Sequence, residues 1–268
     1  MTHRIVRPHA VRRPARWTAF ACGAFALLAA LTLPALAAIA PGVPIARLKT
    51  DVREVAISFD DGPQPGPVLD SLLAMLAARH AHATFFVIGR ELAAHPEIAQ
   101  RLLAAGHELG NHTWTHPRLD SIPLDSVHVE IGRTDSLLRA LHVKGRILVR
   151  PPYGILSDAV VADLAKHKRV VPLFDVDPSY DFPGITAPDS IVDKTLLWLG
   201  PGSILVVHPW DGNDGPALAI LPGILERLER FGYRVVTVSE LLRIKHAVVE
   251  PSLYHPVEAG GDTGPTTP

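Results

Sequence analysis

The sequence predicts an α/β protein in which parallel strands alternate with helices. Short segments that are apolar almost throughout recur along the chain, and helical patterns of apolar residues stand between them. Nearly continuous apolar strands are typical of a parallel sheet that helices cover on both faces. The residues suited to chemistry stand at or just beyond the C-terminal ends of these segments, where β/α barrels place their active sites.

Seven segments are expected to form the parallel strands. They are Val55–Phe59, Ala83–Val87, Glu108–Asn111, Ile147–Val149, Val170–Phe174, Ile204–Val207 and Arg234–Val236.

Helices are expected between these strands. Val68–Arg79 carries leucines at the spacing i, i+3, i+4, i+7, which is one face of a helix. The later helices are one that begins at a proline and carries Ile98, Leu102 and Leu103, one with Val127, Ile131, Leu138 and Leu141, one with Val160, Val161 and Leu164, the segments Ser190–Leu199 and Ile220–Phe231, and a short helix capped by Ser239.

The N-terminus has the pattern of a secretory signal peptide. The first seventeen residues hold arginines and no acid, and the apolar run Ala19–Leu33 and the small-residue sequence Ala35-Leu36-Ala37 follow. Cleavage after Ala37 leaves 268 − 37 = 231 residues, enough for one domain with a full core. An uncleaved membrane anchor stays open, because the apolar character continues to Ala40. Both alternatives place the protein outside the cytoplasm, periplasmic or secreted.

Cysteine content and charge limit the kinds of metal ligand and of binding partner that the chain can have. The single cysteine, Cys22, lies in the signal segment, so any metal in the mature chain must be held by nitrogen and oxygen ligands. Removing five arginines and no acids changes the formal charge from −1 to −1 − 5 = −6, and this mildly acidic chain has no basic run. Nucleic acid is therefore a poor candidate partner. We expect a linker over 38–50, one domain over 51–247 and a disordered tail over 248–268.

Two motifs predict a metal site. Asp60 and Asp61 follow the first strand and precede a Gly-Pro turn, which also suits a plain turn. His112 and His116 stand at i, i+4, a spacing that puts both imidazoles on one face of a helical turn. Asp61 with these two histidines makes a three-ligand set with room for water, which suits one catalytic divalent metal.

With these motifs the chain resembles polysaccharide deacetylases of the NodB-homology type, carbohydrate esterase family 4. The resemblance covers Val55 to Leu242. Five motifs carry it, namely Ser58-Phe59-Asp60-Asp61-Gly62-Pro63, His112-Thr113-Trp114-Thr115-His116, Arg150-Pro151-Pro152-Tyr153-Gly154, Asp177-Pro178-Ser179-Tyr180-Asp181-Phe182 and Val206-Val207-His208. The fourth departs from the family by one extra residue between its acids and by Phe182 in place of Trp. The resemblance implies a distorted, incomplete (β/α) barrel with about seven parallel strands.

The chemistry of amide hydrolysis and the resemblance together suggest roles for the motif residues. Zinc is the expected ion, Asp60 the general base that Arg150 orients, and His208 the acid that protonates the leaving nitrogen. Asp181 would fix the tautomer and charge of His208. The expected substrate contacts are the backbone N–H of Tyr153 in the oxyanion site, Val206 and Phe182 in a slot for the acetyl methyl group, and Trp210, either as a platform for a sugar ring or as part of the core. Asp175 and Asp177 are alternative ligands that the Asp-His-His set makes unnecessary, and His80, His82, His95, His107, His128, His142 and His167 are expected to face solvent.

The predicted function is a metal-dependent hydrolase that removes N-acetyl groups from an extracytoplasmic polysaccharide of the N-acetylglucosamine type. An esterase acting on O-acetyl groups of xylan-like glycans stays open, because the acyl chemistry is shared. A catalytically inactive carbohydrate-binding envelope protein on the same fold is another alternative. Loss of Asp60, His112, His116 or His208 would favour it, and all four residues are present. A metallophosphodiesterase would need a second metal and more ligands than the motifs offer.

Overall fold

The computed structural model describes residues 39–178, 181, 182, 184–210 and 214–251. The predicted signal peptide and most of the predicted tail lie outside these residues. All described residues belong to one folded unit, Ala35–Pro268.

A parallel sheet forms the centre of the fold. Its strands are β2 (Glu54–Phe59), β3 (Thr84–Val87), β4 (Glu108–Asn111), β6 (Ile204–Val207) and β7 (Arg234–Val236). The order is β4-β3-β2-β6, and β7 pairs with the first half of β2. Because every pairing is parallel, the C-terminal ends of these strands meet at one edge of the sheet.

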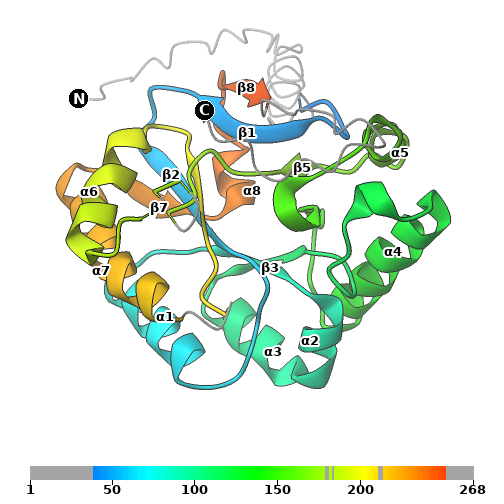
Figure 1. Ribbon diagram of the computed structural model, residues 1–268, viewed down its shortest axis with the longest axis horizontal. Coiled ribbons are helices and arrows are strands. Elements are labelled where there is room, and N and C mark those ends of the chain that lie inside the picture. The colour runs from blue at the N-terminus through cyan, green and yellow to red at the C-terminus, as the bar shows by residue number, and fades with distance from the viewer. Residues whose placement is uncertain (1–38, 179–180, 183, 211–213, 252–268) are drawn as a thin grey trace, which may run out of the picture. The chain divides into compact units, whose positions relative to one another are not determined.

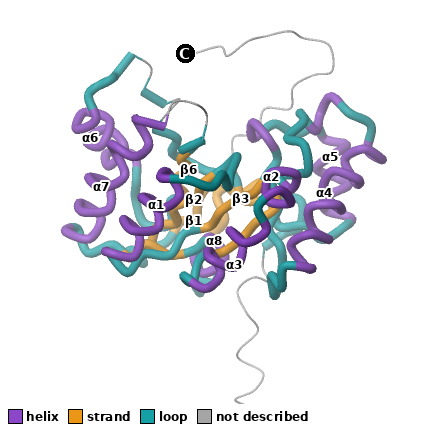
Figure 2. Tube along the Cα trace, turned by 90° about the horizontal axis from the view of Figure 1, so that it is seen from below, coloured by secondary structure: helices purple, strands orange, loops and turns teal. Residues whose placement is uncertain are grey.

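A second sheet and single bridges complete a distorted, incomplete barrel. β1 (Pro44–Lys49) pairs in parallel with β5 (Val171–Pro172) and antiparallel with β8 (Val248–Pro251). Isolated parallel bridges place Val149 beside Asn111 of β4 and Val176 beside Leu205 of β6. Figures 1 and 2 show β2 and β3 between the helices, with α6 and α7 on one side and α4 and α5 on the other. The α/β fold and the incomplete barrel predicted from the sequence are confirmed.

Several predicted boundaries differ from the structure. The expected linker 38–50 contains β1, in which Ile45 and Leu48 are buried. The expected tail begins with β8, which pairs with β1. The expected strand Ile147–Val149 makes only the single bridge at Val149, and two prolines follow it closely. β5 is short because Pro172 has no N–H to donate to a neighbouring strand.

The helices follow the predicted order. Their bounds are α1 (Pro67–Ala78), α2 (Gly89–Ala94), α3 (Pro96–Ala104), α4 (Leu124–Ala140), α5 (Asp158–Lys166), α6 (Pro188–Trp198), α7 (Asp214–Arg230) and α8 (Val238–Leu241), with short 3-10 turns at Leu119–Ser121 and Pro152–Gly154. The short helix α2 was not predicted. α8 is capped by Thr237 in a capping box with Glu240, and not by Ser239 as expected.

Alternation along β2 separates the apolar core from the site. Val55, Ile57 and Phe59 pack in the main core with the buried faces of α1, α3 and α7. Ser58 lies on the opposite face of the strand, and its hydroxyl accepts a hydrogen bond from the buried Arg150. The interior of the barrel is therefore polar next to the C-terminal end of β2.

Candidate metal centre and active site

The backbone after β2 aims both aspartates into the barrel. Asp60 continues the strand and stays on the face of Ser58, where its side chain is buried. An extended Asp61 would point the other way, but its φ of 71° is left-handed and turns its carboxylate towards His112 and His116. A side chain at the next residue, Gly62, would come within 2.3 Å of Trp210, so only glycine fits this close approach.

The histidine pair lies on a loop, and the prediction of a helical turn is wrong. β4 ends at Asn111, and Thr113 and His116 both adopt left-handed backbone conformations, with φ values of 69° and 63°. These conformations fold the loop back on itself and bring the imidazoles of His112 and His116 to a centroid distance of 4.9 Å. The i, i+4 spacing thus brings the two imidazoles together through a folded loop and not through a helical turn.

Polar side chains that the sequence analysis did not select hold this loop. Asn111 Oδ1 accepts a hydrogen bond from the Thr113 amide at 2.8 Å, and the Thr113 hydroxyl accepts one from the His116 amide at 3.1 Å. Glu130 of α4 accepts from the amides of Trp114 and Thr115 at 2.9 and 2.7 Å. The position of Asn111 directly before His112 was the one sequence feature that pointed to a residue holding this loop. Glu130 is distant in sequence, and no sequence feature connected it with the loop.

Asp61, His112 and His116 form a compact set of possible metal ligands. Asp61 Oδ1 lies 3.0 Å from His116 Nε2 and 3.5 Å from His112 Nε2. One ligand atom from each residue lies within 4.8 Å of the others. Asp61 Oδ1 is buried, and no donor among the described residues makes a well-directed hydrogen bond to it. Since an unsatisfied buried carboxylate oxygen is costly, a divalent cation fits this donor set.

The charges around these three residues shift the pKa values of Asp61 and His112. Burial raises the pKa of Asp61, but contacts with His112 and His116 outweigh burial and hold that pKa well below its usual range. Burial lowers the pKa of His112, and the neighbouring Asp60 and Asp61 outweigh it and raise the pKa. The same anionic surroundings that attract a proton to His112 would attract a metal cation.

Arg150 organises the anionic side of the site. It is fully buried, and its Nη1 donates to Asp60 Oδ1 and to the Ser58 hydroxyl, both at 2.7 Å. Nε and Nη2 donate to the carbonyls of Pro172 and Leu173, and the guanidinium lies 4.0 Å from the ring centroid of Phe86. These contacts fix the guanidinium, so the Asp60 carboxylate is held in one orientation.

The backbone of Arg150 also orients a histidine. The carbonyl of Arg150 lies 2.8 Å from His112 Nδ1. A carbonyl only accepts, so Nδ1 carries the proton and the lone pair of Nε2 faces Asp61. One residue therefore positions both Asp60 and His112.

His208 follows β6 and lies beside a carboxylate other than the expected one. The carboxylate of Asp177 is 3.6 Å from His208 Nδ1. Asp181 instead accepts a hydrogen bond from the Asp177 amide at 2.7 Å and donates its own amide to the Asp177 carbonyl. Through these two hydrogen bonds Asp181 supports Asp177. The expectation that Asp181 contacts His208 is therefore corrected in favour of Asp177.

Comparison with known proteins identifies relatives of this chain. The sequence pattern of the family described as polysaccharide deacetylase matches residues 47–171. A peptidoglycan-N-acetylglucosamine deacetylase of Bacillus cereus is 35% identical over 72% of this chain and 89% of its own length. The chain belongs to the polysaccharide deacetylase family.

Other relatives carry related names. The peptidoglycan-N-acetylmuramic acid deacetylase PdaC of Bacillus subtilis is 34% identical over 72% of this chain, and this chain spans only 39% of that longer protein. A chitooligosaccharide deacetylase of Sinorhizobium fredii is 36% identical over 65% of this chain and 80% of its own length.

Solved structures share the fold. The crystal structure of a peptidoglycan N-acetylglucosamine deacetylase aligns with a TM-score of 0.68 and 28% identity, over 74% of this chain and 92% of the other. A carbohydrate esterase family 4 pseudoenzyme from Bacillus anthracis aligns with a TM-score of 0.66 and 25% identity, over 75% of this chain and 69% of the other. Because the family fold also occurs in a pseudoenzyme, activity must be argued from the site residues.

The expected substrate contacts of this deacetylase family member divide into one exposed residue and three buried ones. Tyr153 is 61% exposed, and its ring centroid lies 4.8 Å from that of His116. Val206 is fully buried, so it does not line an accessible slot. Phe182 is 8% exposed and packs edge-on to Trp198 at 5.5 Å. Trp210 is also 8% exposed and packs in the core with Phe85, which favours its core role over a sugar platform.

Proposed function

We propose that this protein is a metal-dependent hydrolase that removes N-acetyl groups from an extracytoplasmic polysaccharide built on N-acetylglucosamine. One observation carries the proposal. The possible ligands Asp61, His112 and His116 converge beside an Asp60–Arg150 ion pair at the C-terminal end of β2. A hydrolase requires the buried Arg150, the buried Asp60 and the set of possible metal ligands together, whereas a catalytically inactive protein does not.

Asp61, His112 and His116 would hold the metal. Two imidazoles and one carboxylate suit zinc, and the mature chain has no thiolate to offer. When bound, such an ion supplies a water of lowered pKa and a Lewis acid for the acyl oxygen.

Asp60 is proposed to accept the proton of the attacking water. Its carboxylate accepts a hydrogen bond from the Arg150 guanidinium at 2.7 Å, which holds it in the fixed orientation that a positioned base requires. The Nε2 atom of His112 lies 3.8 Å from Asp60, so the base stands next to the ligand set.

His208 is proposed to donate a proton to the leaving nitrogen. Asp177 is buried beside it and would stabilise the imidazolium that this step requires. Asp181 acts through its hydrogen bonds to Asp177. This proposal keeps the predicted acid and changes its carboxylate partner.

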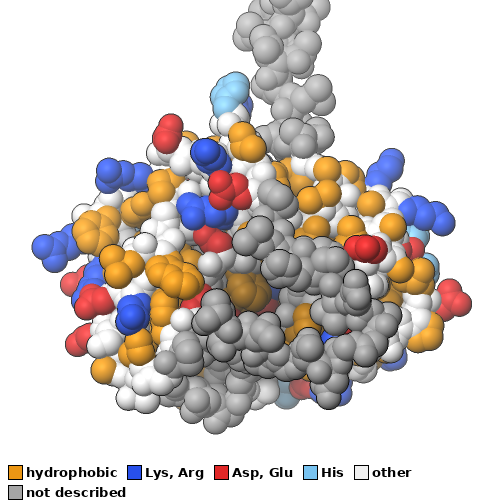
Figure 3. Space-filling view, turned by 45° about the horizontal axis from the view of Figure 1, so that its top comes forward, with side chains coloured by type: hydrophobic (Ala, Val, Ile, Leu, Met, Phe, Trp, Pro, Cys, Tyr) orange, Lys and Arg blue, Asp and Glu red, His pale blue; other side chains and the backbone are white. Residues whose placement is uncertain are grey.

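An aminosugar glycan is the proposed substrate. The relatives are named as deacetylases of peptidoglycan or of chitooligosaccharides. The exposed ring of Tyr153 beside His116 supports contact with a sugar, because aromatic faces pack against apolar faces of small ligands. On the face shown in Figure 3, cationic and anionic side chains are interspersed, which supports a glycan over nucleic acid as the partner.

Acetate release tests the proposal. Purified protein is incubated with N-acetylglucosamine oligomers, peptidoglycan and O-acetylated xylan, as isolated, after chelation and after zinc is restored. We expect release from the N-acetylated glycans that chelation abolishes and zinc restores. Release from xylan alone would make the protein an O-acetyl esterase. No release from a fully metal-loaded sample would indicate a binding protein on the same fold.

Export is part of the proposal. Residues 1–37 are proposed to be a signal peptide with cleavage after Ala37. In the described part of the chain, no helix is long and apolar enough to span a membrane. The intact mass of exported protein tests this, since a mature chain begins at Ala38. A mass that includes Arg4 to Arg16 would instead indicate a retained anchor.

A further inference from the structure

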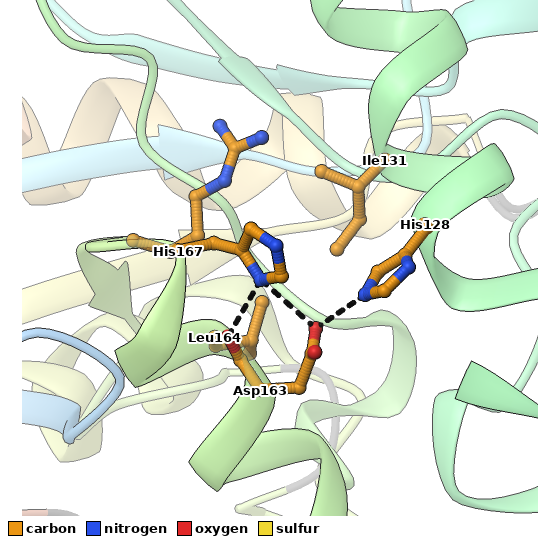
Figure 4. Close-up of a pocket in the computed structure, with 6 residues that line it drawn as sticks. His128, Ile131, Asp163, Leu164 and His167 are labelled. Atoms are coloured by element: carbon orange, nitrogen blue, oxygen red, sulfur yellow. Dashed lines mark hydrogen bonds and ion pairs between the residues drawn. The ribbon is translucent and has the colours of Figure 1, made fainter. Parts of the chain in front are cut away.

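A second group of metal-type ligands lies between helices α4 and α5. His128 belongs to α4, Asp163 to α5, and His167 follows the last turn of α5. One ligand atom from each lies within 4.8 Å of the others. Figure 4 shows both imidazoles pointing at the Asp163 carboxylate. We name these three residues the helix cluster, and we propose that it is a second metal site, for a borderline transition-metal dication such as Zn²⁺, Ni²⁺ or Cu²⁺.

The geometry brings both imidazoles to one carboxylate oxygen. Asp163 Oδ2 lies 2.9 Å from His128 Nε2 and 3.4 Å from His167 Nδ1, and the two rings meet edge-on at 5.0 Å. Asp163 and His167 are one helical turn apart, so they lie on one face of α5. His128 completes the set from the neighbouring helix, which lets one ion bridge two elements.

The charges around the helix cluster leave its carboxylate available. Arg169 lines the same cavity, but its guanidinium pairs with Asp135 at 2.6 Å. One dication can bind both neutral imidazole rings and the carboxylate together.

There is room for further ligands. The cavity that the helix cluster lines has a volume of about 330 Å³, and His128 and His167 are 45% and 46% exposed. Water can therefore complete the coordination. Two imidazoles and one carboxylate select Zn²⁺, Ni²⁺ or Cu²⁺ over Mg²⁺ or Ca²⁺, which prefer oxygen ligands.

One hydrogen bond of His167 lowers the metal affinity expected for the helix cluster. His167 Nδ1 also lies 2.9 Å from the backbone carbonyl of Asp163, to which it donates when protonated. Metal binding at Nδ1 must replace this hydrogen bond. We therefore expect weaker binding than at Asp61, His112 and His116, with the metal of the helix cluster exchanging during dialysis against a weak chelator.

Metal stoichiometry tests the proposal. The full protein is dialysed against buffered free Zn²⁺, and the bound metal is counted in the wild type, His128→Ala, His167→Ala and the control His142→Asn, an exposed histidine outside the cluster. The wild type and the control should bind one equivalent more than either alanine variant. A wild type that binds no second equivalent would overturn the proposal, and so would two variants that both keep it.

A second readout guards against misfolded variants. Co²⁺ replaces Zn²⁺, and its visible absorption is titrated in the same proteins while circular dichroism monitors the fold. The wild type should show two saturating phases, and folded His128→Ala and His167→Ala only one. The phase from Asp61, His112 and His116 is followed separately in His112→Ala, so failure of the proposed function and failure of this site give different patterns. Two phases in folded His128→Ala and His167→Ala would refute the helix cluster as the ligand set.

Discussion

The described chain presents the same donor set twice, on two different kinds of backbone. In the candidate metal centre, Asp61, His112 and His116 follow parallel strands, and Asp61 and His116 have left-handed conformations. In the helix cluster the ligands lie on or directly after helices, and both imidazoles are nearly half exposed. The difference lies in the surroundings. The first set has Asp60, a buried Arg150 and a hydrogen-bonded His112 beside it, and the helix cluster has no comparable buried acid–cation pair among the residues that line its cavity.

Donor atoms alone therefore do not specify a reaction. A hydrolase needs a base, an acid and a group that fixes each of them, and of the two sets of described residues only Asp61, His112 and His116 lie beside the groups proposed for these roles. The helix cluster would bind an ion without activating a substrate.

Asp60→Asn should reduce acetate release by about 10² to 10⁴-fold, the usual contribution of a positioned base. The amide cannot accept the proton, while the metal ligands remain. Metal content should stay at the wild-type value, and Asp70→Asn, an exposed acid of α1, serves as the control. If Asp60→Asn kept its turnover, the base would lie elsewhere, and Asp177 would be examined first.

Arg150→Lys should reduce kcat by about 10 to 100-fold, a typical cost of losing a residue that orients catalytic groups. Lysine keeps the charge but cannot bond Asp60, Ser58 and two carbonyls at once. Steady-state kinetics of Arg150→Lys and the exposed control Arg146→Lys measure this effect. Equal kcat values for the two variants would show that the orientation of Asp60 is unimportant.

Asp177→Asn should lower kcat by about 10-fold or more, because the imidazolium of His208 would lose its carboxylate. Asp181→Asn should stay within about 3-fold of the wild type, since an amide oxygen still accepts from the Asp177 N–H. The pair of variants is measured on one N-acetylated oligomer. A larger loss in Asp181→Asn would restore the role that the sequence analysis gave to Asp181.

His107 shows how burial changes the pKa of an imidazole outside both ligand sets. It is buried, not solvent-facing as expected, and its Nδ1 accepts the Ala83 amide at 3.2 Å. Burial and then the neighbouring His82 lower the pKa of His107 to about 4. Between about pH 6.5 and 4 the unfolded chain binds a proton that the folded chain refuses, so the stability from this group is present above pH 6.5 and lost as pH falls.

The free energy of unfolding should therefore fall by about 3 kcal/mol from this group between pH 6.5 and 4. Urea denaturation across this range should show a shallower fall in His107→Gln than in the wild type. The exposed control His80→Asn should keep the wild-type slope. Identical slopes in all three proteins would mean that His107 is protonated without cost.

The sequence predicted the elements that carry the site better than the shape of the site itself. Apolar strands can be recognised in the sequence, so the positions of Asp60 and His208 at strand ends were predicted correctly. The conformation of the loop after β4 depends on Thr113, His116 and the distant acceptor Glu130, and no local pattern reveals it. The proximity of Asp177 to His208 depends on two segments far apart in the sequence, and no local pattern shows which acid of the motif lies there. β1 was missed because it pairs with segments more than a hundred residues away.

Two double variants test most directly the claim that only one of the two ligand sets supports deacetylation. Metal content and acetate release are measured on the same samples. His112→Ala/His116→Ala should lose one metal equivalent and nearly all acetate release, while His128→Ala/His167→Ala should lose only the more weakly held equivalent and keep wild-type release. Deacetylation that survives in the first variant, or is lost in a folded second variant that keeps its tightly bound metal, would contradict the account.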